Sequence, residues 1–341
     1  MTKTLSPLAP IDWQQPFSQW TLTLVQGNPD LRWQPHHAST ARWERVPTHK
    51  VRVLVEGLRY FMPLAITSET VLSQDTQTAW EFTLTLEEPC AFEGMFQLVK
   101  DALDGFQIDW CLTPVDADFP RQKRLLISDM DSTLLEGECI DELAELMGCK
   151  AEVARITEET MNGRLDFESA LIERVALLKG LPVEAVQSVL KSTPRMQGAK
   201  TLVQTMKQLG AFTLLVSGGF TPFTEALSCE LGMEAHQANH LEVEDGFFTG
   251  RVIPPILGKE AKREALDYYA HRLGLGRESV LAIGDGANDV MMLEASGLGV
   301  AFHAKPNVQA QSRCLVRFND LTALLYFQGI PQSAWSNFNG S

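Results

Sequence analysis

Positive charge is scarce in this sequence. Its 29 lysines and arginines are outnumbered by 43 aspartates and glutamates, which gives a formal net charge of −14 at pH 7. Nucleic acids and anionic membranes are bound by clustered Lys and Arg, so this balance argues against both as partners. An acidic protein can still hold one basic pocket, and a small anionic substrate is therefore compatible with the composition.

Long apolar runs and closely spaced cysteines are missing as well. The sequence has no run of about eighteen apolar residues, the length that a membrane span needs. Its first residues, MTKTLSPLAPIDWQQP, lack the unbroken apolar segment of a signal peptide. The six cysteines are scattered without a C-x-x-C pair, which favours reduced thiols over a disulfide or zinc framework. We therefore expect a cytoplasmic protein without a membrane span.

Amino-acid usage changes near residue 120. Six of the seven tryptophans and ten of the 17 prolines lie at or before this position, but only four of the 24 glycines do. We interpret residues 113–122 as a linker between an N-terminal module (1–115) and a larger second part (121–328). In the module, apolar runs predict strands at Val51–Val55 and Phe82–Leu86 and a helix at Phe92–Leu103. This indicates a small α+β domain for packing or regulation, because it contains no cluster of catalytic residue types.

The second part alternates short apolar runs with helical patterns. Strands are predicted at Leu125–Ser128, Phe212–Val216, Val280–Ile283, Leu298–Phe302 and Leu315–Phe318. Such alternation is typical of an α/β fold in which helices cover both faces of a parallel sheet, and ligands bind beyond the carboxyl ends of the strands. A long insert of helical pattern at about 138–198, between the first two strands, predicts a lid at this edge.

Polar residues follow three of these strands. They are Asp129-Met130-Asp131-Ser132-Thr133, Ser217-Gly218-Gly219 and Gly284-Asp285-Gly286-Ala287-Asn288-Asp289, with Lys262 on an intervening helical pattern. One such segment could be a turn or a helix cap, but three at successive strand ends indicate a shared ligand. Four carboxylates against one lysine favour a hard divalent cation, and oxygen ligands favour Mg²⁺ over zinc. A phosphate could then bind to Ser217 and the N–H groups of Gly218 and Gly219.

These segments resemble, in order, the four motifs of the haloacid dehalogenase (HAD) superfamily, and the match is closest to its phosphoserine phosphatases. The resemblance covers residues 121–328 and implies a Rossmann-like parallel sheet with an inserted helical cap. It also implies Mg²⁺-dependent hydrolysis of O-phosphoserine to serine and phosphate, the last step of serine biosynthesis. A likeness of the N-terminal module to ligand-sensing ACT-type domains stays open because no motif supports it, and so does a homodimer.

The resemblance implies a role for each motif residue. Asp129 attacks the phosphorus to form an aspartyl-phosphate, and Asp131 protonates the leaving oxygen and later deprotonates water. Mg²⁺ is bound by Asp129, Asp285 and the main-chain carbonyl of Asp131, with Asp289 supporting the site. The other motif residues neutralise the charge of the phosphate, position it, or surround the site. They are Thr133, Ser217, Gly218, Gly219, Lys262 and Asn288.

Glu138 and Arg174 are the candidates for substrate selection. Arg174 falls within an apolar stripe, where it either packs its stem on the core or forks to a carboxylate. Glu138 lies where the chain leaves the sheet for the cap, a place where a lone acid is most often solvated. By the resemblance, Glu138 meets the substrate ammonium group and Arg174 meets its carboxylate. Met161 and Phe167 match the apolar wall of the family's pocket, although core packing alone would explain both.

Two alternatives stay open at this point. The same chemistry could act on another small phosphomonoester or transfer the phosphoryl group to another hydroxyl acceptor, although Glu138 and Arg174 argue against sugar phosphates. The second alternative is a regulatory protein that only binds serine or a phosphorylated ligand. The presence of both Asp129 and Asp131 argues against it.

Overall fold

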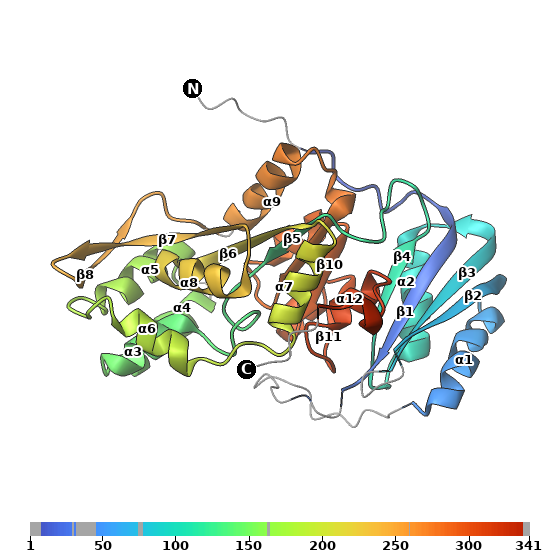
Figure 1. The fold of residues 1–341 in the computed structure, drawn as a ribbon, viewed down its shortest axis with the longest axis horizontal. Helices are drawn as coiled ribbons and strands as arrows, with labels where there is room; N and C mark the ends of the chain where they lie inside the picture. Colours follow the sequence, from blue (N-terminus) through green and yellow to red (C-terminus); the bar gives the residue numbers. More distant parts are fainter. Residues whose placement is uncertain are drawn as a thin grey trace.

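A single sheet runs through the molecule (Figure 1). The computed structural model describes residues 8–28, 31, 46–73, 78–161, 164–258 and 260–336 of the 341-residue chain. Among these residues, eleven strands form one continuous sheet, with an N-terminal part at one end and a group of cap helices at the other. None of the helices in these ranges is both long and apolar enough to cross a membrane.

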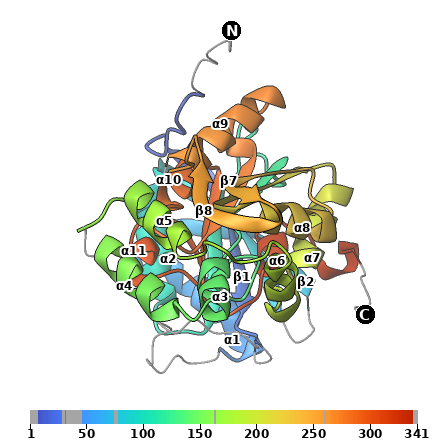
Figure 2. The same ribbon diagram turned by 90° about the vertical axis from the view of Figure 1, so that its left-hand side faces the viewer.

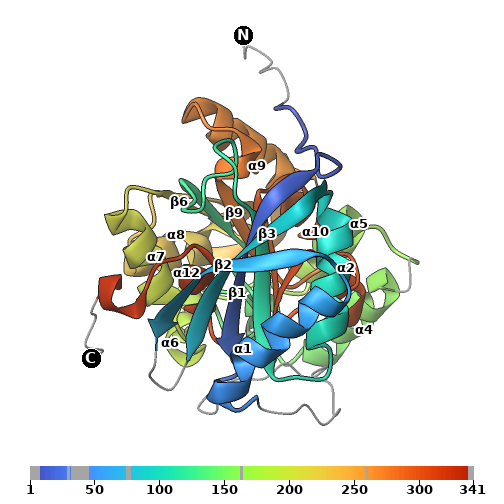
Figure 3. The same ribbon diagram turned by 90° about the vertical axis from the view of Figure 1, so that its right-hand side faces the viewer.

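The N-terminal part is an antiparallel sheet with helices packed on one face (Figure 3). Its strands are β1 (Phe17–Gln26), β2 (Leu64–Ser73), β3 (Ala79–Cys90) and β4 (Ile108–Pro114), in the order β2-β3-β1-β4. Its helices are α1 (Thr48–Gly57) and α2 (Phe92–Leu103), with a short 3-10 helix, η1 (Leu58–Tyr60), after α1. The strand predicted at Phe82–Leu86 lies within β3, and the helix predicted at Phe92–Leu103 is α2.

The strand predicted at Val51–Val55 is wrong, because these residues lie within α1. A run rich in β-branched valine favours a strand when propensity is considered alone. The apolar spacing is helical, however, since Val51, Val55 and Leu58 are buried together. In a strand, Val53 would share a face with Val51 and Val55, yet it is 62% exposed. Packing of the helical face on the sheet therefore outweighs the strand propensity.

The second part has the predicted α/β architecture around a parallel sheet. Its strands are β5 (Leu125–Ser128), β6 (Phe212–Phe220), β7 (Ala235–Glu244), β8 (Phe247–Ile253), β9 (Val280–Gly284), β10 (Leu298–Phe302) and β11 (Cys314–Val316). They follow the N-terminal strands in the order β11-β10-β9-β5-β6-β7-β8, and all but β8 are parallel to their neighbours within this part. Strand β5 lies between β6 and β9, so the connections that follow it lead to opposite sides of the strand. The carboxyl end of a strand at such a point in the sheet is the expected position of a ligand.

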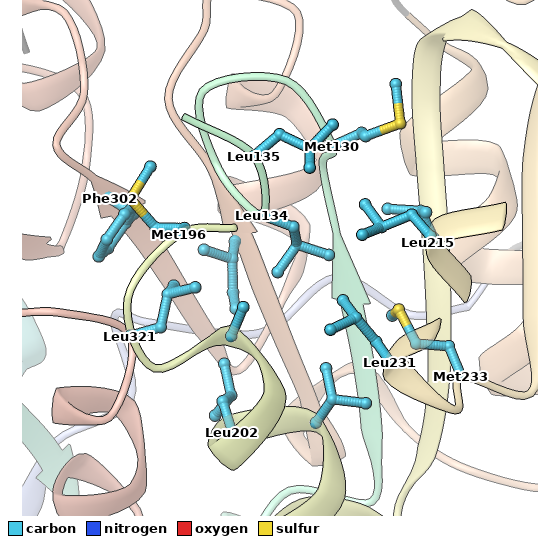
Figure 4. Packing of buried hydrophobic residues seen from close by; sticks show 14 of the residues in the cluster. Met130, Leu134, Leu135, Met196, Leu202, Leu215, Leu231, Met233, Phe302 and Leu321 are labelled. Carbon is cyan, nitrogen blue, oxygen red and sulfur yellow. The ribbon is translucent and has the colours of Figure 1, made fainter. Parts of the chain in front are cut away.

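Helices cover both faces of this sheet. They are α7 (Ala199–Gln208), α8 (Thr221–Leu231), α9 (Ala261–Arg272), α10 (Val290–Ala295), α11 (Pro306–Gln309) and α12 (Ala323–Phe327), with 3-10 helices η2 (Arg277–Ser279) and η3 (Gln332–Ala334). One core contains residues of α7, α8 and α12, and a second contains residues of α9 and α10. Figure 4 shows Met130, Leu134 and Leu135, which come directly after β5, within the first core. The loop that follows β5 is therefore anchored by its own apolar residues.

The insert between β5 and β6 forms the cap. It consists of α3 (Cys139–Leu146), α4 (Lys150–Met161), α5 (Phe167–Ala176) and α6 (Ala185–Ser192), in agreement with the predicted helical insert. Figure 2, which faces this end of the molecule, shows these helices gathered with β8 at the end of the sheet. The cap is joined to the rest of the fold through the segment after β5 and the segment before α7.

Strands β4 and β11 join the two parts by antiparallel pairing. Beside this joint, the buried Asp109 accepts hydrogen bonds from the N–H groups of Arg317 (2.8 Å) and Phe318 (2.9 Å) and from the side-chain amide of Asn319 (2.9 Å). The predicted linker at residues 113–122 begins within the last two residues of β4 and ends before β5, and strands on both sides of it belong to the same sheet.

Candidate active site

The chain leaves β5 through a tight loop that presents two carboxylates beyond the end of the strand. Asp129 continues the parallel pairing of β5 with β9 by one residue, since its N–H donates to the Ile283 carbonyl of β9 (3.0 Å). Met130 is fully buried, whereas Asp129 and Asp131 on either side of it line a cavity. The Met130 carbonyl accepts from the N–H of Leu134 (2.8 Å), which folds the loop back. Strand-like alternation thus aims both predicted catalytic aspartates at one space.

The loop after β9 carries a second pair of carboxylates. Asp285 lines the cavity, whereas Asp289 is buried behind it and accepts the N–H of Gly286 at Oδ2 (2.9 Å). A Cβ at Gly284 would lie 2.2 Å from the Asp289 carboxyl carbon, so only glycine fits at this position. From the first loop, the Thr133 hydroxyl donates to Asp285 Oδ1 at 3.5 Å. The two loops therefore meet at their carboxylates.

Lys262, on α9, links these two loops. Its Nζ lies 2.7 Å from Asp129 Oδ1 and 2.6 Å from Asp289 Oδ1, and all three side chains are buried. Burial acts to lower the pKa of Lys262, but Asp129 and Asp289 outweigh it and raise the pKa above its ordinary value. A charged ammonium group therefore stands beside Asp129 throughout the ordinary pH range.

Three buried carboxylates gather next to this lysine, those of Asp129, Asp285 and Asp289. One oxygen of each lies within 4.8 Å of the others. Burial raises the pKa values of Asp129 and Asp285, and neighbouring carboxylates raise them further. A hard divalent cation would relieve this repulsion, and carboxylate oxygens are donors that such a cation prefers. Both oxygens of Asp289 already accept hydrogen bonds, from Lys262 and Gly286, so its geometry suits support of the site from behind.

Asp131 occupies a different environment from the three-carboxylate cluster. Its Oδ1 accepts the N–H of Cys139 at the start of α3 (3.0 Å), and its Oδ2 lies 3.2 Å from where a Cβ on Gly219 would stand. Burial raises the pKa of Asp131 to about 8, and the charge of Glu138 adds to the effect. The carboxyl group is thus suited to carry a proton at neutral pH and to release it during a reaction.

The end of β6 supplies hydrogen-bond donors for an anion. Ser217, Gly218 and Gly219 line the cavity, and the N–H of Gly219 donates to Ser217 Oγ (2.9 Å). The Gly218 carbonyl accepts from the side-chain amide of Asn239 on β7 (2.9 Å), which holds the Gly218–Gly219 peptide in place. Helix α8 begins two residues later with Pro222 in its first turn. A hydroxyl, backbone N–H groups and a helix N-terminus are therefore combined at this position.

The cap closes the cavity from the opposite side. The cavity has a volume of about 260 Å³ and is lined by core loops and by residues of α3, α4 and α5. Phe167 packs over the segment Ser217–Gly219, called here the anion loop, since its ring lies 3.3 Å from where a Cβ on Gly218 would stand. Asn288 also lines the cavity. The side chain of Met161, predicted as part of the apolar wall, lies outside the described residues.

Glu138 and Arg174 both line the cavity on its cap side. Glu138 Oε1 accepts the Ser132 hydroxyl (3.1 Å), and Arg174 donates from Nε to the Ala170 carbonyl (3.2 Å). Although Glu138 is partly open to solvent, desolvation by the surrounding walls raises its pKa, and desolvation lowers the pKa of Arg174. The charge of Arg174 opposes the shift of Glu138, and the charge of Glu138 opposes the shift of Arg174. A carboxyl group and a guanidinium group therefore line the same cavity as Asp129 and Asp131, the predicted catalytic aspartates.

Comparison with known proteins identifies the family. A family model for haloacid dehalogenase-like hydrolases matches residues 126–294. The chain is 43% identical over 225 residues to the phosphoserine phosphatase of Archaeoglobus fulgidus, a match that covers 66% of this chain and 65% of that protein. It is 40% identical over 246 residues to the probable phosphoserine phosphatase of Schizosaccharomyces pombe, over 70% of this chain and 82% of that protein. The chain belongs to the phosphoserine phosphatases of the haloacid dehalogenase superfamily.

The resemblance inferred from the four motifs is thus confirmed, and a solved phosphoserine phosphatase supports the fold. The structure titled a phospho-aspartyl intermediate analogue of phosphoserine phosphatase aligns with a TM-score of 0.56 and 39% identity, over 60% of this chain and 99% of that one. The matched region spans 65% of the length of the Archaeoglobus phosphoserine phosphatase, just under two thirds.

Two polar residues of the site are missed by the sequence argument. Lys305 lines the cavity from the loop after β10, and Asn239 supports the anion loop while its Oδ1 accepts the N–H of Leu257 (2.7 Å). Lys305 follows the predicted strand Leu298–Phe302, so the rule that strand ends carry ligands would have found it. Asn239 has no such signal, because β7 contains few apolar residues and shows no strand pattern.

Proposed function

We propose that this protein is a Mg²⁺-dependent phosphoserine phosphatase that hydrolyses O-phosphoserine to serine and inorganic phosphate. The observation that carries the proposal is the single cavity in which Asp129 and Asp131 face Glu138 and Arg174. The names of the relatives give the same activity, and one solved relative is described as an analogue of a phospho-aspartyl intermediate. At one end of the cavity a carboxylate can act as the nucleophile. At the other end a negative and a positive side chain can bind the ammonium and carboxylate groups of an amino acid, which together suit this substrate.

The reaction takes place in two steps with balanced proton transfers. An oxygen of Asp129 bonds to phosphorus while the bond from phosphorus to the serine oxygen breaks. The proton of Asp131 passes to the departing oxygen, so serine leaves as the alcohol. Water then attacks the aspartyl-phosphate and gives a proton to Asp131, and the Asp129 carboxylate is released together with phosphate. One carboxyl group serves both steps because the second reverses the proton flow.

Positive charge and hydrogen-bond donors hold the phosphoryl group during both steps. Lys262 stands beside the attacking carboxylate, and the Ser217 hydroxyl with the N–H of Gly218 can bind the phosphoryl oxygens, while the N–H of Gly219 already donates to Ser217 Oγ. Asn288, in the same loop as Asp285, faces the substrate from the other side. Bound Mg²⁺ would be held by Asp129, Asp285 and the main-chain carbonyl of Asp131, and it would supply positive charge against the developing negative charge.

We further propose that the reaction is the last step of serine biosynthesis and takes place in the cytoplasm. All six cysteines are unpaired thiols. Unpaired thiols are usual in a reducing compartment.

Metal removal tests the cation. We expect EDTA to lower the rate of phosphate release from O-phosphoserine by at least about 100-fold, because the clustered carboxylates would then repel a phosphate dianion. Excess Mg²⁺ should restore the rate. Phosphate release is measured with and without chelator, with EDTA already saturated by Mg²⁺ as the control. Full activity in free chelator would exclude the metal role.

Replacement of Arg174 tests the substrate. We expect Arg174→Ala to lower kcat/KM for O-phosphoserine by about 2–4 kcal/mol in free-energy terms, because the half-buried Arg174 lines the cavity, where it would pair with the substrate carboxylate. Phosphoethanolamine, which lacks the carboxylate, should be affected far less. Phosphate release from both compounds is measured for the wild type and the variant. Equal losses on the two compounds would mean that Arg174 does not recognise the amino-acid end.

Arg155→Ala provides the matched control. Arg155 also lies on the cap, on α4, but its side chain is about half exposed and forms surface ion pairs with Glu152 and Glu159 (both 2.7 Å). Surface pairs of this kind contribute little, so both substrates should be used at the wild-type rate. If the wild type itself fails to prefer O-phosphoserine over phosphoethanolamine, the proposed substrate is wrong.

A further inference from the structure

The anion loop is a bulge in the pairing of β6 with β7. The pairing runs to Val216 and Gln237 and resumes at Phe220 and Asn239. Three residues of β6, Ser217–Gly219, therefore stand opposite one residue of β7. Such a bulge releases backbone groups of the longer strand from the sheet, and buried backbone groups without partners are costly. The loop can therefore offer donors to a ligand only when its remaining groups are bound elsewhere.

The side chain of Asn239 binds one of these released groups. Its amide nitrogen donates to the Gly218 carbonyl (2.9 Å), and its amide oxygen accepts the N–H of Leu257 (2.7 Å). Asn239 is 1% exposed. An amide can match a carbonyl on one side and an N–H on the other in only one orientation, so both partners fix the side chain. Asn239 therefore holds the anion loop against the segment that leads to α9.

The peptide between Gly218 and Gly219 carries this constraint to Ser217. The peptide is trans, so its C=O and N–H point in opposite directions in one plane. With the Gly218 carbonyl held by Asn239, the N–H of Gly219 is directed to Ser217 Oγ, to which it donates (2.9 Å). Because the hydroxyl oxygen accepts on this side, its own hydrogen is turned away from Gly219. A hydroxyl that accepts one hydrogen bond is also a stronger donor in another.

The second hydrogen bond of Asn239 reaches the support of Lys262. Leu257 lies shortly before α9, and Lys262 stands in the first turn of that helix. Lys262 in turn places its Nζ 2.7 Å from Asp129 Oδ1. Asn239 thus contacts both of the segments that bring a hydroxyl donor or a positive charge to the place where a phosphoryl group would be attacked.

We propose that Asn239 is a positioning residue for the phosphoryl group, which aligns the Ser217 hydroxyl through the Gly218–Gly219 peptide and fixes the anion loop relative to the segment before Lys262. This inference rests on the proposed function and deepens it. Without the amide, the peptide would be free to rotate, and the N–H of Gly219 would leave Ser217 Oγ. The hydroxyl hydrogen would then no longer be directed at a phosphoryl oxygen.

Asn239→Ala combined with Ser217→Ala tests this alignment. Ser217→Ala removes a direct donor and should lower kcat/KM for O-phosphoserine by about 100-fold. Asn239→Ala acts through Ser217 and should lower it by about 30-fold, as expected when a buried carbonyl loses its partner. Once the hydroxyl is gone, Asn239→Ala should cost less than about threefold more, because residues that act as a unit are not additive. Phosphate release is measured for the four proteins below the unfolding transition of each.

Asn239→Asp separates alignment from general damage to the fold. A protonated carboxyl group can donate to the Gly218 carbonyl as the amide does, whereas a carboxylate cannot. Burial raises the pKa of a carboxyl group, so we expect the activity of this variant relative to the wild type to rise about tenfold from about pH 8.5 to about pH 5.5. Gln237→Ala, two residues earlier on β7, is the matched control and should behave as the wild type at both pH values.

Three results would overturn the proposal. They are losses that multiply in the double variant, an unchanged rate in Asn239→Ala, and an Asn239→Asp rate that stays low at acid pH. If Asn239→Ala does not fold, Asn239→Ser takes its place in the same combination. All rates are also measured with p-nitrophenyl phosphate, because alignment of the phosphoryl group should affect both substrates alike. A wild type that hydrolyses the aryl phosphate but not O-phosphoserine would overturn the proposed function instead, and the role of Asn239 is then decided on the aryl phosphate.

Discussion

Asp129→Asn should abolish turnover while leaving the fold intact. The amide is isosteric with the carboxylate but is a poor nucleophile, so we expect kcat for O-phosphoserine to fall by at least about 10⁴-fold. The Oδ1 position can still accept the N–H of Met130, which donates to it at 2.7 Å in the wild type. Phosphate release measures the rate, and thermal unfolding checks the fold.

A labelling experiment separates loss of the nucleophile from other causes. Rapid acid quenching of the wild type with phosphorus-labelled O-phosphoserine should trap label on the peptide that contains Asp129, and the asparagine variant should trap none. Asp101→Asn, on the exposed face of α2, is the matched control and should behave as the wild type. Undiminished hydrolysis by the Asp129 variant, or label at another residue, would exclude the covalent mechanism.

Lys262→Met should damage both stability and activity. The wild-type ammonium group lies between Asp129 and Asp289 at 2.7 and 2.6 Å, with all three side chains buried. Removing one member of a buried ionic group leaves the others uncompensated, so we expect the free energy of unfolding to fall by about 3 kcal/mol. The rate of phosphate release should fall by about 10³-fold, because charge stabilisation of the phosphoryl group is lost. Urea unfolding and phosphate release measure the two effects.

A double variant distinguishes the structural from the catalytic role of Lys262. Lys262→Met combined with Asp289→Asn removes one of the two uncompensated carboxylates, so most of the lost stability should return. Activity should stay low, because neither change restores a positive charge beside Asp129. Recovery of activity together with stability would mean that Lys262 only supports the fold.

Much of the core could be predicted because its strands are buried on both faces. Leu125–Ser128 and Val280–Ile283 are continuous apolar runs, and polar residues begin where each strand ends. The outer strands give a weaker signal. Most of β2 is exposed or half-exposed, and β7 and β8 form an antiparallel pair at the edge with mixed composition. Their place in the sheet depends on pairing with distant segments, which a local pattern does not reveal.

The residues of the candidate site likewise fall into some that the sequence predicts and some that it does not. Asp129, Asp131, Asp285 and Asp289 occur in short motifs, so the strand-end rule alone brings them together. Lys305 and Asn239 stand alone in the sequence and reach the site through loops that other parts of the fold hold in place. A single polar residue carries no periodic signal, and its role is visible only when its neighbours in space are known.

The joint between β4 and β11 limits how the molecule can open. Asp109 accepts hydrogen bonds from two backbone N–H groups and a side-chain amide across this joint, and the sheet continues through it, so the two parts of the chain cannot swing as separate lobes. An opening of the cavity that separates cap from core would therefore have to displace α3 to α6, which are joined to the core through the segments after β5 and before α7. Such a displacement would be confined to those helices and their two tethers, because the continuous sheet couples the N-terminal part to the parallel-sheet part.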